Sequence, residues 1–327
     1  MDKLVITGAA GFIGTNLSLA LNGLFDLILI DDLSRSGSQK NLQLLNQVGL
    51  DVKVLDVANE SELYSFLKKI GNIDGLVHLA AQTSLIESLR NPKHDFDVNA
   101  LGTLNLLEYL RKFYPDCVGI FLSSNKVYGN LNSLDYEETQ TRFSPASIGL
   151  SFDESFPICP LGGYSISKAV SDYYVNEYGK RFSMPVVSLR QSAVYGRNQN
   201  SRSDQGWVSY FTNEISSRNN VKLRGNGKQV RDILYIDDFV VLIQKILKGN
   251  ISPGESYNVG GGINFSLSIL ELFKILEDLT TFKAEYTLGE MSTEDQKYFV
   301  SDNSKIHSLT AWTPKIAPQD GIARLLE

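Results

Sequence analysis

The chain has 327 residues, 43% of them hydrophobic, and a formal net charge of −6 at pH 7. This length supports one large α/β domain with a smaller lobe. An acidic chain without a basic cluster argues against a nucleic-acid partner. No apolar stretch approaches the roughly 20 residues of a membrane span. The first expected strand begins at Lys3, which leaves no room for a signal peptide.

The cysteines and histidines of the chain show no metal-binding spacing. Cys117 and Cys159 are the two cysteines, and neither belongs to a metal-spaced cluster. The three histidines, His78, His94 and His307, are scattered along the chain, and His78 is interpreted as structural. We therefore expect a reducing cytoplasmic location and no metal.

A glycine-rich turn follows the first expected strand, residues 3–7. Gly8 permits a tight turn, Gly11 lets a pyrophosphate approach the backbone, and Gly14 lets the following helix pack on the strand. That helix, expected over 12–21, offers free N–H groups and a positive dipole end to phosphates. The pattern predicts a dinucleotide site that includes Phe12 and Ile13.

Two acids end the next expected strand, residues 27–30. Asp31 and Asp32 lie about 20 residues past the glycines, where an acid typically accepts hydrogen bonds from the adenosine ribose. A carboxylate there would repel a 2′-phosphate, so the sequence predicts NAD rather than NADP. Ser34 and Arg35 follow and join the expected cofactor contacts. The alternative for Asp31 is a helix-capping or solvated role.

Further strands and helices alternate along the first half of the chain. Strands are expected at 52–55, 75–79, 118–123 and 186–189, and helices at 60–69, 95–113 and 164–182. Such alternation predicts a Rossmann-type, doubly wound parallel sheet. Ligands bind beyond the carboxyl ends of such strands. The cofactor residues expected there are Asp56, Val57, Leu79, Ala80, Ala81 and Ser123, although plain tight packing would also explain the two alanines.

The second half of the chain suggests a discontinuous lobe. Residues 1–189 are expected to form the cofactor domain, to which the chain returns at about 233–259, beginning at Ile233–Ile236. Residues 190–232 and 260–327 would then form the substrate lobe. Gly129–Leu161 is polar and aromatic, and it is expected to form a long loop over the active site.

Tyr164 and Lys168 carry the expected chemistry. They lie four residues apart, on one face of the helix expected over 164–182. A free tyrosine has a pKa of about 10. The positive charge of Lys168, together with that of an oxidised nicotinamide, is expected to lower that pKa, so that the phenol can accept a proton. Lys168 would also hold the nicotinamide ribose. Ser124 ends a strand and could bond the same substrate oxygen. The alternative for the pair is a solvated surface position.

The chain resembles the extended short-chain dehydrogenase/reductase family of nucleotide-sugar enzymes over nearly its whole length. The resemblance rests on the glycine-rich turn, Leu79-Ala-Ala, Asn99, Ser124 and Tyr164/Lys168, and it adds Asn99 to the cofactor site. Other segments resemble the CDP-paratose 2-epimerase (CDP-tyvelose 2-epimerase) branch of that family. Those segments are Asp32-Leu-Ser-Arg-Ser-Gly37 with Asn41, Ser124-Asn-Lys-Val-Tyr-Gly129, Glu138–Arg142, Arg190–Gly196, Asp204-Gln-Gly-Trp207, Gly225–Asp232 and Asp295-Gln296.

This resemblance implies an NAD-dependent epimerase that oxidises a sugar hydroxyl transiently and returns the hydride to the opposite face. The carbon would be position 2 of a CDP-3,6-dideoxyhexose, converting CDP-paratose to CDP-tyvelose in a homodimer or homotetramer. The substrate residues expected from residue positions and resemblance together are Gln82, Thr83, Ser124, Asn125, Lys126, Gln191, Ser192, Gln205, Trp207 and Arg231.

Three rival functions stay open. A UDP-glucose-type 4-epimerase and an NAD(P)-dependent nucleotide-sugar reductase use the same tyrosine and lysine, and a dinucleotide-sensing regulatory protein would need neither. A 4,6-dehydratase is disfavoured, since the related dehydratases hold Asp and Glu at Asn125 and Lys126, and an amide and an ammonium cannot replace that acid and base.

One position departs from the family pattern. Ser292 stands where the family usually has a second phosphate-binding arginine. Loss of a charge-assisted contact would weaken phosphate binding by about 1.5–3 kcal/mol, unless another cation replaces it or the natural substrate differs. The candidate cations are Arg197, Arg202, Lys222 and Lys228.

Overall fold

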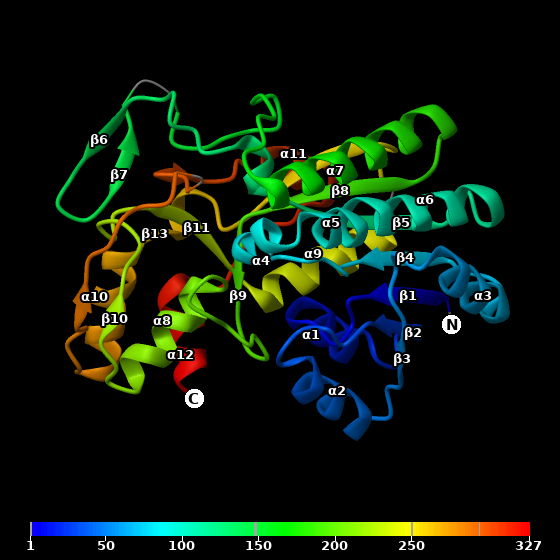
Figure 1. The fold of residues 1–327 in the computed structure, drawn as a ribbon, viewed down its shortest axis with the longest axis horizontal. Coiled ribbons are helices and arrows are strands. Elements are labelled where there is room, and N and C mark those ends of the chain that lie inside the picture. Colours follow the sequence, from blue (N-terminus) through cyan, green and yellow to red (C-terminus); the bar gives the residue numbers. More distant parts are fainter. Residues whose placement is uncertain (1, 147–148, 250, 294) are drawn as a thin grey trace.

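A computed structural model describes residues 2–146, 149–249, 251–293 and 295–327. Five residues of the expected domains and loop lie outside the described residues: Met1, Ser147, Ile148, Asn250 and Glu294. Figure 1 shows a layered α/β domain on the right and a smaller lobe on the left.

The α/β domain is built on a parallel sheet. In the described part of the chain this sheet has seven strands in the order β12-β8-β5-β4-β1-β2-β3. The order reverses direction between β1 and β4, so a crevice opens at their carboxyl ends. The predicted Rossmann-type fold is confirmed. The strands are β1 (Lys3–Thr7), β2 (Asp26–Asp31), β3 (Val52–Val54), β4 (Gly75–His78), β5 (Val118–Ser124), β8 (Val186–Gln191) and β12 (Glu255–Val259).

Helices cover both faces of this sheet. One face packs against α3 (Glu60–Ile70), α6 (Gly102–Phe113) and α7 (Gly163–Phe182), and the other against α1 (Phe12–Leu21), α2 (Ser38–Gln47) and α9 (Ile236–Lys248). Neighbouring residues of β1 point to opposite faces. Leu4 and Ile6 join the cluster that contains Leu17 of α1, whereas Val5 joins the cluster of α3 and α6.

The helix expected over 95–113 is interrupted. After α4 (Leu85–Arg90), the chain forms α5 (Pro92–Phe96), a π-helical turn η1 (Asp97–Leu101) and then α6. A π turn inserts an extra residue into the helical repeat and redirects the side chains on it. Apolar spacing alone does not reveal this turn, because α5 and α6 keep their helical pattern on either side.

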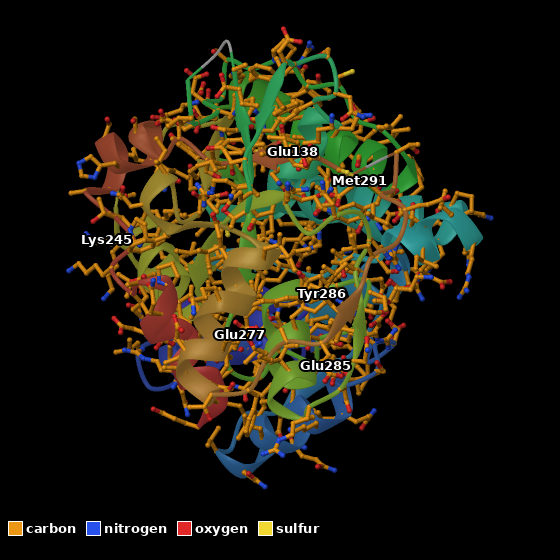
Figure 2. The ribbon with its side chains drawn as sticks, turned by 90° about the vertical axis from the view of Figure 1, so that its left-hand side faces the viewer. Glu138, Lys245, Glu277, Glu285, Tyr286 and Met291 are labelled. Carbon is orange, nitrogen blue, oxygen red and sulfur yellow. The ribbon has the colours of Figure 1, made fainter. Side chains whose placement is uncertain are left out.

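The lobe has its own sheet and helices. Strand β11 (Val230–Tyr235) pairs with β9 (Ala193–Tyr195), β13 (Ser266–Ser268) and β15 (Tyr298–Phe299). Figure 2 faces this end of the molecule, with Glu277 on α10 and Tyr286 on β14. The remaining elements of the lobe side are α8 (Trp207–Ser216), β10 (Val221–Lys222), α10 (Ile269–Thr280), β14 (Tyr286–Thr287) and α12 (Pro318–Leu326). Helix α11 (Ser304–Thr310) packs instead against β12 and α9 of the α/β domain.

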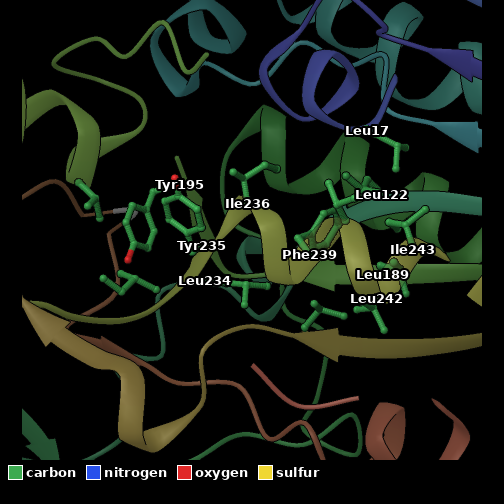
Figure 3. Packing of buried hydrophobic residues seen from close by; sticks show 14 of the residues in the cluster. Leu17, Leu122, Leu189, Tyr195, Leu234, Tyr235, Ile236, Phe239, Leu242 and Ile243 are labelled. Atoms are coloured by element: carbon green, nitrogen blue, oxygen red, sulfur yellow. The ribbon is translucent and has the colours of Figure 1, made fainter. Parts of the chain in front are cut away.

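The expected return to the main sheet at Ile233–Ile236 is wrong in its position. Residues 233–235 belong to β11 and pair with β9 of the lobe sheet, and the chain re-enters the cofactor domain through α9 and β12. The apolar run 233–236 is buried in either sheet, so its composition could not distinguish them. At this joint the Tyr195 and Tyr235 rings meet edge to face, with centroids 5.4 Å apart (Figure 3).

The segment Gly129–Leu161 contains a hairpin rather than one continuous loop. Strands β6 (Tyr136–Glu138) and β7 (Phe143–Pro145) pair antiparallel. The segment packs on the lobe, where the Phe143 N–H donates to the Lys228 carbonyl at 2.9 Å and the Phe152 N–H to the Val300 carbonyl at 2.8 Å. Its aromatic residues are therefore largely accounted for by packing on β15.

Candidate functional site

A cavity of about 730 Å³ lies at the carboxyl ends of β1 and β4, where the strand order reverses, and it extends to the lobe. This is where an open α/β sheet binds ligands. No described residue of Gly129–Leu161 lines this cavity, and the expectation that the segment lies over the active site stays a prediction. The predicted site residues on the cavity wall are Gly8, Gly11, Phe12, Ile13, Gly14, Asp31, Asp32, Ser34, Arg35, Asp56, Val57, Leu79, Ala80, Ala81, Gln82, Thr83, Ser123, Tyr164, Lys168, Gln191, Ser192, Gln205 and Trp207.

The glycine-rich turn has no room for side chains. A Cβ on Gly8, which has φ of +68°, would lie 2.6 Å from the Ala80 nitrogen, and one on Gly14 would lie 2.1 Å from the Gly8 carbonyl oxygen. Helix α1 begins at Phe12, and its N-cap Gly11 provides no side-chain cap. The first-turn N–H groups therefore face the cavity with the positive end of the helix dipole. This arrangement fits a dinucleotide pyrophosphate.

The two acids at the carboxyl end of β2 have different surroundings. The Asp31 carboxylate accepts hydrogen bonds from the backbone N–H groups of Ala10 (3.0 Å) and Leu33 (2.8 Å), and burial raises its pKa. Asp32 is partly exposed and accepts bonds from the backbone and hydroxyl of Ser34. Asp31 thus holds the glycine turn in shape, and both acids face the cavity.

Residues 197–206, here called the strap, connect the lobe to the cofactor domain. The Asn200 side chain donates to the Ser36 carbonyl at 2.8 Å, and the Ser84 hydroxyl donates to the Asp204 carboxylate at 2.7 Å. Arg202 also bonds Ser36. Because six strap residues line the cavity, the strap forms one of its walls.

Arg35 reaches across the cavity from the loop after β2. Its guanidinium donates to the Thr83 hydroxyl at 2.7 Å and also bonds the Gln205 side chain of the strap. Gln205 in turn bonds Thr83. Three residues that sequence analysis placed in different ligand contacts thus form one network in this structure. Burial lowers the pKa of Arg35, with the nearby Arg202 guanidinium acting in the same direction.

Tyr164, Lys168 and Ser124 come together at the end of β5. The Lys168 ammonium donates to the Leu122 carbonyl, and the Ser124 hydroxyl bonds the Tyr164 phenol. Burial lowers the pKa of Lys168 to about 8 and raises the pKa of Tyr164. In the protein alone, removal from water outweighs the favourable contacts of the phenolate. The expected lowering of the Tyr164 pKa by Lys168 together with an oxidised nicotinamide stays a prediction.

Asn99 lies behind the cavity wall. The side chain donates to the Gln82 carbonyl and accepts from the Gln82 N–H, both at 3.0 Å. This reciprocal pair fixes the backbone of Gln82, whose side chain does line the cavity. Asn99 itself does not reach the cavity surface, although the sequence comparison with the family assigned it to the cofactor site.

Asn125, Lys126 and Arg231 gather around Asp295, outside the cavity wall. The Asp295 carboxylate accepts from the Lys126 ammonium at 2.9 Å and from the Arg231 guanidinium at 2.7 Å, and these two cations hold its pKa well below its usual range despite burial. The Asn125 amide donates to Gln296 at 3.2 Å. Asp295 and Gln296, for which the sequence predicted no role, hold the three predicted residues.

Polar atoms of the cavity wall lack protein partners at several predicted positions. The buried Ser123 hydroxyl, Gln191 amide oxygen and Trp207 indole nitrogen have no hydrogen-bond partner among the described residues. Buried polar groups are normally bonded, so these atoms mark the part of the wall suited to a polar ligand. The Ser192 hydroxyl differs, since it already bonds Asp232.

The described residues contain no cluster of His, Cys, Asp or Glu that could hold a metal ion. Burial lowers the pKa of His78 to about 3, and its ring bonds the Thr7 hydroxyl at 2.7 Å, as a structural histidine would. A search of the described helices finds none long and apolar enough to cross a membrane.

Comparisons with known proteins agree with this geometry. Residues 4–260 match the model of the NAD dependent epimerase/dehydratase family. The chain is 38% identical to CDP-paratose 2-epimerase from Salmonella typhi, over 99% of this chain and 98% of that protein.

Two solved structures are similar over almost their whole length. UDP-glucose 4-epimerase from Thermotoga maritima, determined with UDP-glucose, is 26% identical with a TM-score of 0.84, covering 99% of this chain and 97% of that one. UDP-glucuronic acid 4-epimerase from Bacillus cereus, determined with UDP-glucuronic acid and NAD, is 28% identical with a TM-score of 0.83, covering 99% and 98%.

Proposed function

Because this chain belongs to the NAD dependent epimerase/dehydratase family, we propose that it inverts carbon 2 of CDP-paratose to give CDP-tyvelose. The observation that carries the proposal is the meeting of Tyr164, Ser124 and Lys168 beside the glycine-rich turn. The substrate is supported by the 38% identity to a CDP-paratose 2-epimerase over almost the full length of both chains.

The glycine-rich turn, Asp31 and Asp32 would hold NAD, and Lys168 would hold the nicotinamide ribose. When bound, NAD supplies a reversible hydride acceptor, so the reaction needs no net oxidant. Tyr164 accepts the proton of the sugar hydroxyl as the keto sugar forms and returns it when the inverted alcohol is regenerated. The Ser124 hydroxyl, which bonds the phenol, is positioned to bond the same substrate oxygen.

Asn125 and Lys126 support an epimerase over a dehydratase. Loss of water from a sugar needs an acid and a base, whereas an amide neither gives nor takes a proton at neutral pH. The Lys126 ammonium pairs with the Asp295 carboxylate at 2.9 Å. We assign Lys126 to binding a sugar hydroxyl or polarising the developing ketone.

Arg231 is assigned to the substrate pyrophosphate. A guanidinium suits phosphate oxygens, and Asp295 holds this one in place at 2.7 Å. Of the four cations considered as replacements at Ser292, Lys228 pairs with Glu138 and Arg197 with Asp237, whereas Arg202 lines the cavity. Arg202 is therefore our candidate for the second cation.

Proton NMR of the purified protein with CDP-paratose in deuterated water, without added NAD, tests the proposal. Formation of CDP-tyvelose with no deuterium at carbon 2 would support retained NAD and hydride return. Deuterium at carbon 2 would show proton abstraction from carbon and exclude the hydride mechanism. UDP-glucose offered in parallel tests the second candidate, a 4-epimerase, which the likeness to the Thermotoga maritima structure favours.

We also infer that two copies of the chain associate through α6 and α7. Large apolar side chains stand exposed on both helices: Phe113 (44%) on α6, and Tyr173 (56%) and Phe182 (43%) on α7. Sedimentation velocity should show a dimer that Tyr173→Glu converts to a monomer, while Leu288→Glu, at an exposed position on the lobe, leaves it intact. A monomeric unmodified protein would exclude this association.

A further inference from the structure

Asp95, at the end of α5, is a buried carboxylate that the proposed mechanism does not use. Asp95 is only 1% exposed. It accepts hydrogen bonds from the Ser167 hydroxyl at 2.6 Å and from the Gln82 amide at 2.7 Å, with the Asn99 amide at 3.4 Å. No ion pair of Asp95 is found within the described ranges. Burying a carboxylate without a cationic partner costs free energy, which hydrogen bonds from neutral donors offset only in part.

The donors to Asp95 come from two different parts of the site. Gln82 follows β4 and lines the cavity. Ser167 lies on α7 between Tyr164 and Lys168, and its hydroxyl is also 3.0 Å from the Tyr164 carbonyl. Asp95 therefore links the loop on the cavity wall to the helix that carries the proton-transfer pair.

The charge of Asp95 acts on that pair. Burial raises the pKa of Tyr164, and Asp95 adds to the rise, while Ser124 on β5 and Arg35 oppose it. Burial lowers the pKa of Lys168 and is opposed by Asp172 on α7 and by Asp95. Next to Lys168, His78 on β4 is neutral at pH 7. A negative charge at Asp95 thus favours the protonated form of both residues.

We propose that Asp95 is a positioning residue, which joins the cavity loop to the catalytic helix and holds a negative charge beside Tyr164 and Lys168. The proposal rests on the proposed function in one respect, that Tyr164 moves the substrate proton. A negative charge at Asp95 would leave a smaller fraction of Tyr164 as phenolate at a given pH. Because the phenolate that does form is a stronger base, it takes a proton from a sugar hydroxyl more completely.

Asp95→Asn in the holoenzyme tests the charge with little change in shape. An amide can still accept from Gln82, and the Ser167 hydroxyl can rotate to accept from it. Removing the negative charge should move the acid limb of the pH profile of kcat/KM to lower pH by about one unit. Ser167→Ala, which removes a hydrogen bond but keeps the charge, should leave that limb in place. Asp97→Asn, a partly exposed acid on the adjacent turn, should also leave it in place.

A second measurement separates this proposal from the proposed function. Ultraviolet titration of the holoenzyme, with the Tyr164→Phe titration subtracted, follows the Tyr164 phenolate without turnover, and Asp95→Asn should move it to lower pH. If CDP-paratose does not react but this shift is seen, the substrate is wrong and the role of Asp95 stands. An unshifted titration, or an equal loss of kcat/KM at every pH, would reduce Asp95 to a structural residue and overturn the proposal.

Discussion

At the scale of single residues, the site pairs two groups whose charged forms burial disfavours. Burial raises the pKa of Tyr164 and lowers that of Lys168 to about 8. At neutral pH the phenol therefore holds its proton, and the ammonium is charged in most molecules. A positive charge brought beside Tyr164 by oxidised NAD would favour the phenolate. The protein thus makes proton transfer depend on a loaded cofactor site.

Replacing Tyr164 by Phe removes the proton acceptor and leaves the ring. We expect kcat to fall by about 10²- to 10⁴-fold, with unchanged NAD content, as measured by NMR turnover and by the absorbance of released cofactor. Tyr174→Phe, at an exposed position of the same helix, is the matched control and should keep full activity. A Tyr164→Phe protein with near-normal turnover would contradict the mechanism.

His78 should make the fold sensitive to acid. Its pKa is about 3 in the folded protein against 6.5 for the free group, so below about pH 6.5 the unfolded chain takes up a proton that the folded chain does not. The free energy of unfolding should then fall by up to about 1.4 kcal/mol per pH unit from this group. Between about pH 6.5 and about pH 5, the free energy of unfolding measured in urea should depend less steeply on pH for His78→Gln than for the unmodified protein. His307→Gln, at an exposed site, should retain the full dependence.

At the scale of elements, β1, the glycine-rich turn and α1 form the unit that receives the cofactor. The turn stays close to β4 because Gly8 has no side chain to meet Ala80, and α1 stays close to the turn because Gly14 has none to meet Gly8. The Asp31 carboxylate then ties the turn to β2 through the Ala10 N–H. Backbone proximity, rather than any one side chain, shapes this part of the site.

Gly14→Ala should damage this unit. The new Cβ would lie 2.1 Å from the Gly8 oxygen, so the helix or the turn must shift, at a cost of about 1–3 kcal/mol in the free energy of unfolding. Copurified NAD should fall together with stability, as measured by chemical denaturation and cofactor release. Gly149→Ala, where a Cβ would meet no atom within 4 Å, is the control. Full NAD content in Gly14→Ala would show that this close approach is not needed.

At the scale of the whole molecule, the cavity belongs to both parts of the chain. The cofactor domain supplies the glycine turn and the catalytic helix, and the strap closes one side through Asn200, Arg202 and Asp204. Arg35 and Gln205 bridge the two walls directly. A ligand bound in this cavity contacts both parts, so its binding and the docking of the lobe should support each other.

Removing NAD should therefore destabilise the entire protein. Loss of a ligand that saturates the folded state far above its Kd costs about 3–4 kcal/mol, which corresponds to a fall in Tm of roughly 5 °C or more. Calorimetry of stripped and reloaded protein measures this fall. Added NAD should restore Tm, whereas NADP should not, because Asp31 and Asp32 would face its 2′-phosphate. Equal recovery with NADP would contradict the assigned role of these acids.

The sequence by itself determined the local units of this protein. Three of these units depend only on neighbours along the chain: the glycine spacing, the two acids at the end of β2 and the four-residue separation of Tyr164 and Lys168. The alternation of strands and helices predicted the parallel sheet. The resemblance supplied the family, and the family match bears it out. Each of these inferences needed only short-range geometry or the spacing of residues along the chain.

Only the tertiary structure decided what depends on distant contacts. The apolar residues 233–235 joined the lobe sheet because their partner β9 lies there. Described residues of the segment 129–161 pack on the lobe. Burial raises the pKa of Tyr164, and how deeply a side chain is buried depends on the whole fold. The Asp95 and Asp295 clusters join residues as far apart as 126 and 295, and a spacing along the chain carries no information about such pairs until the chain is folded.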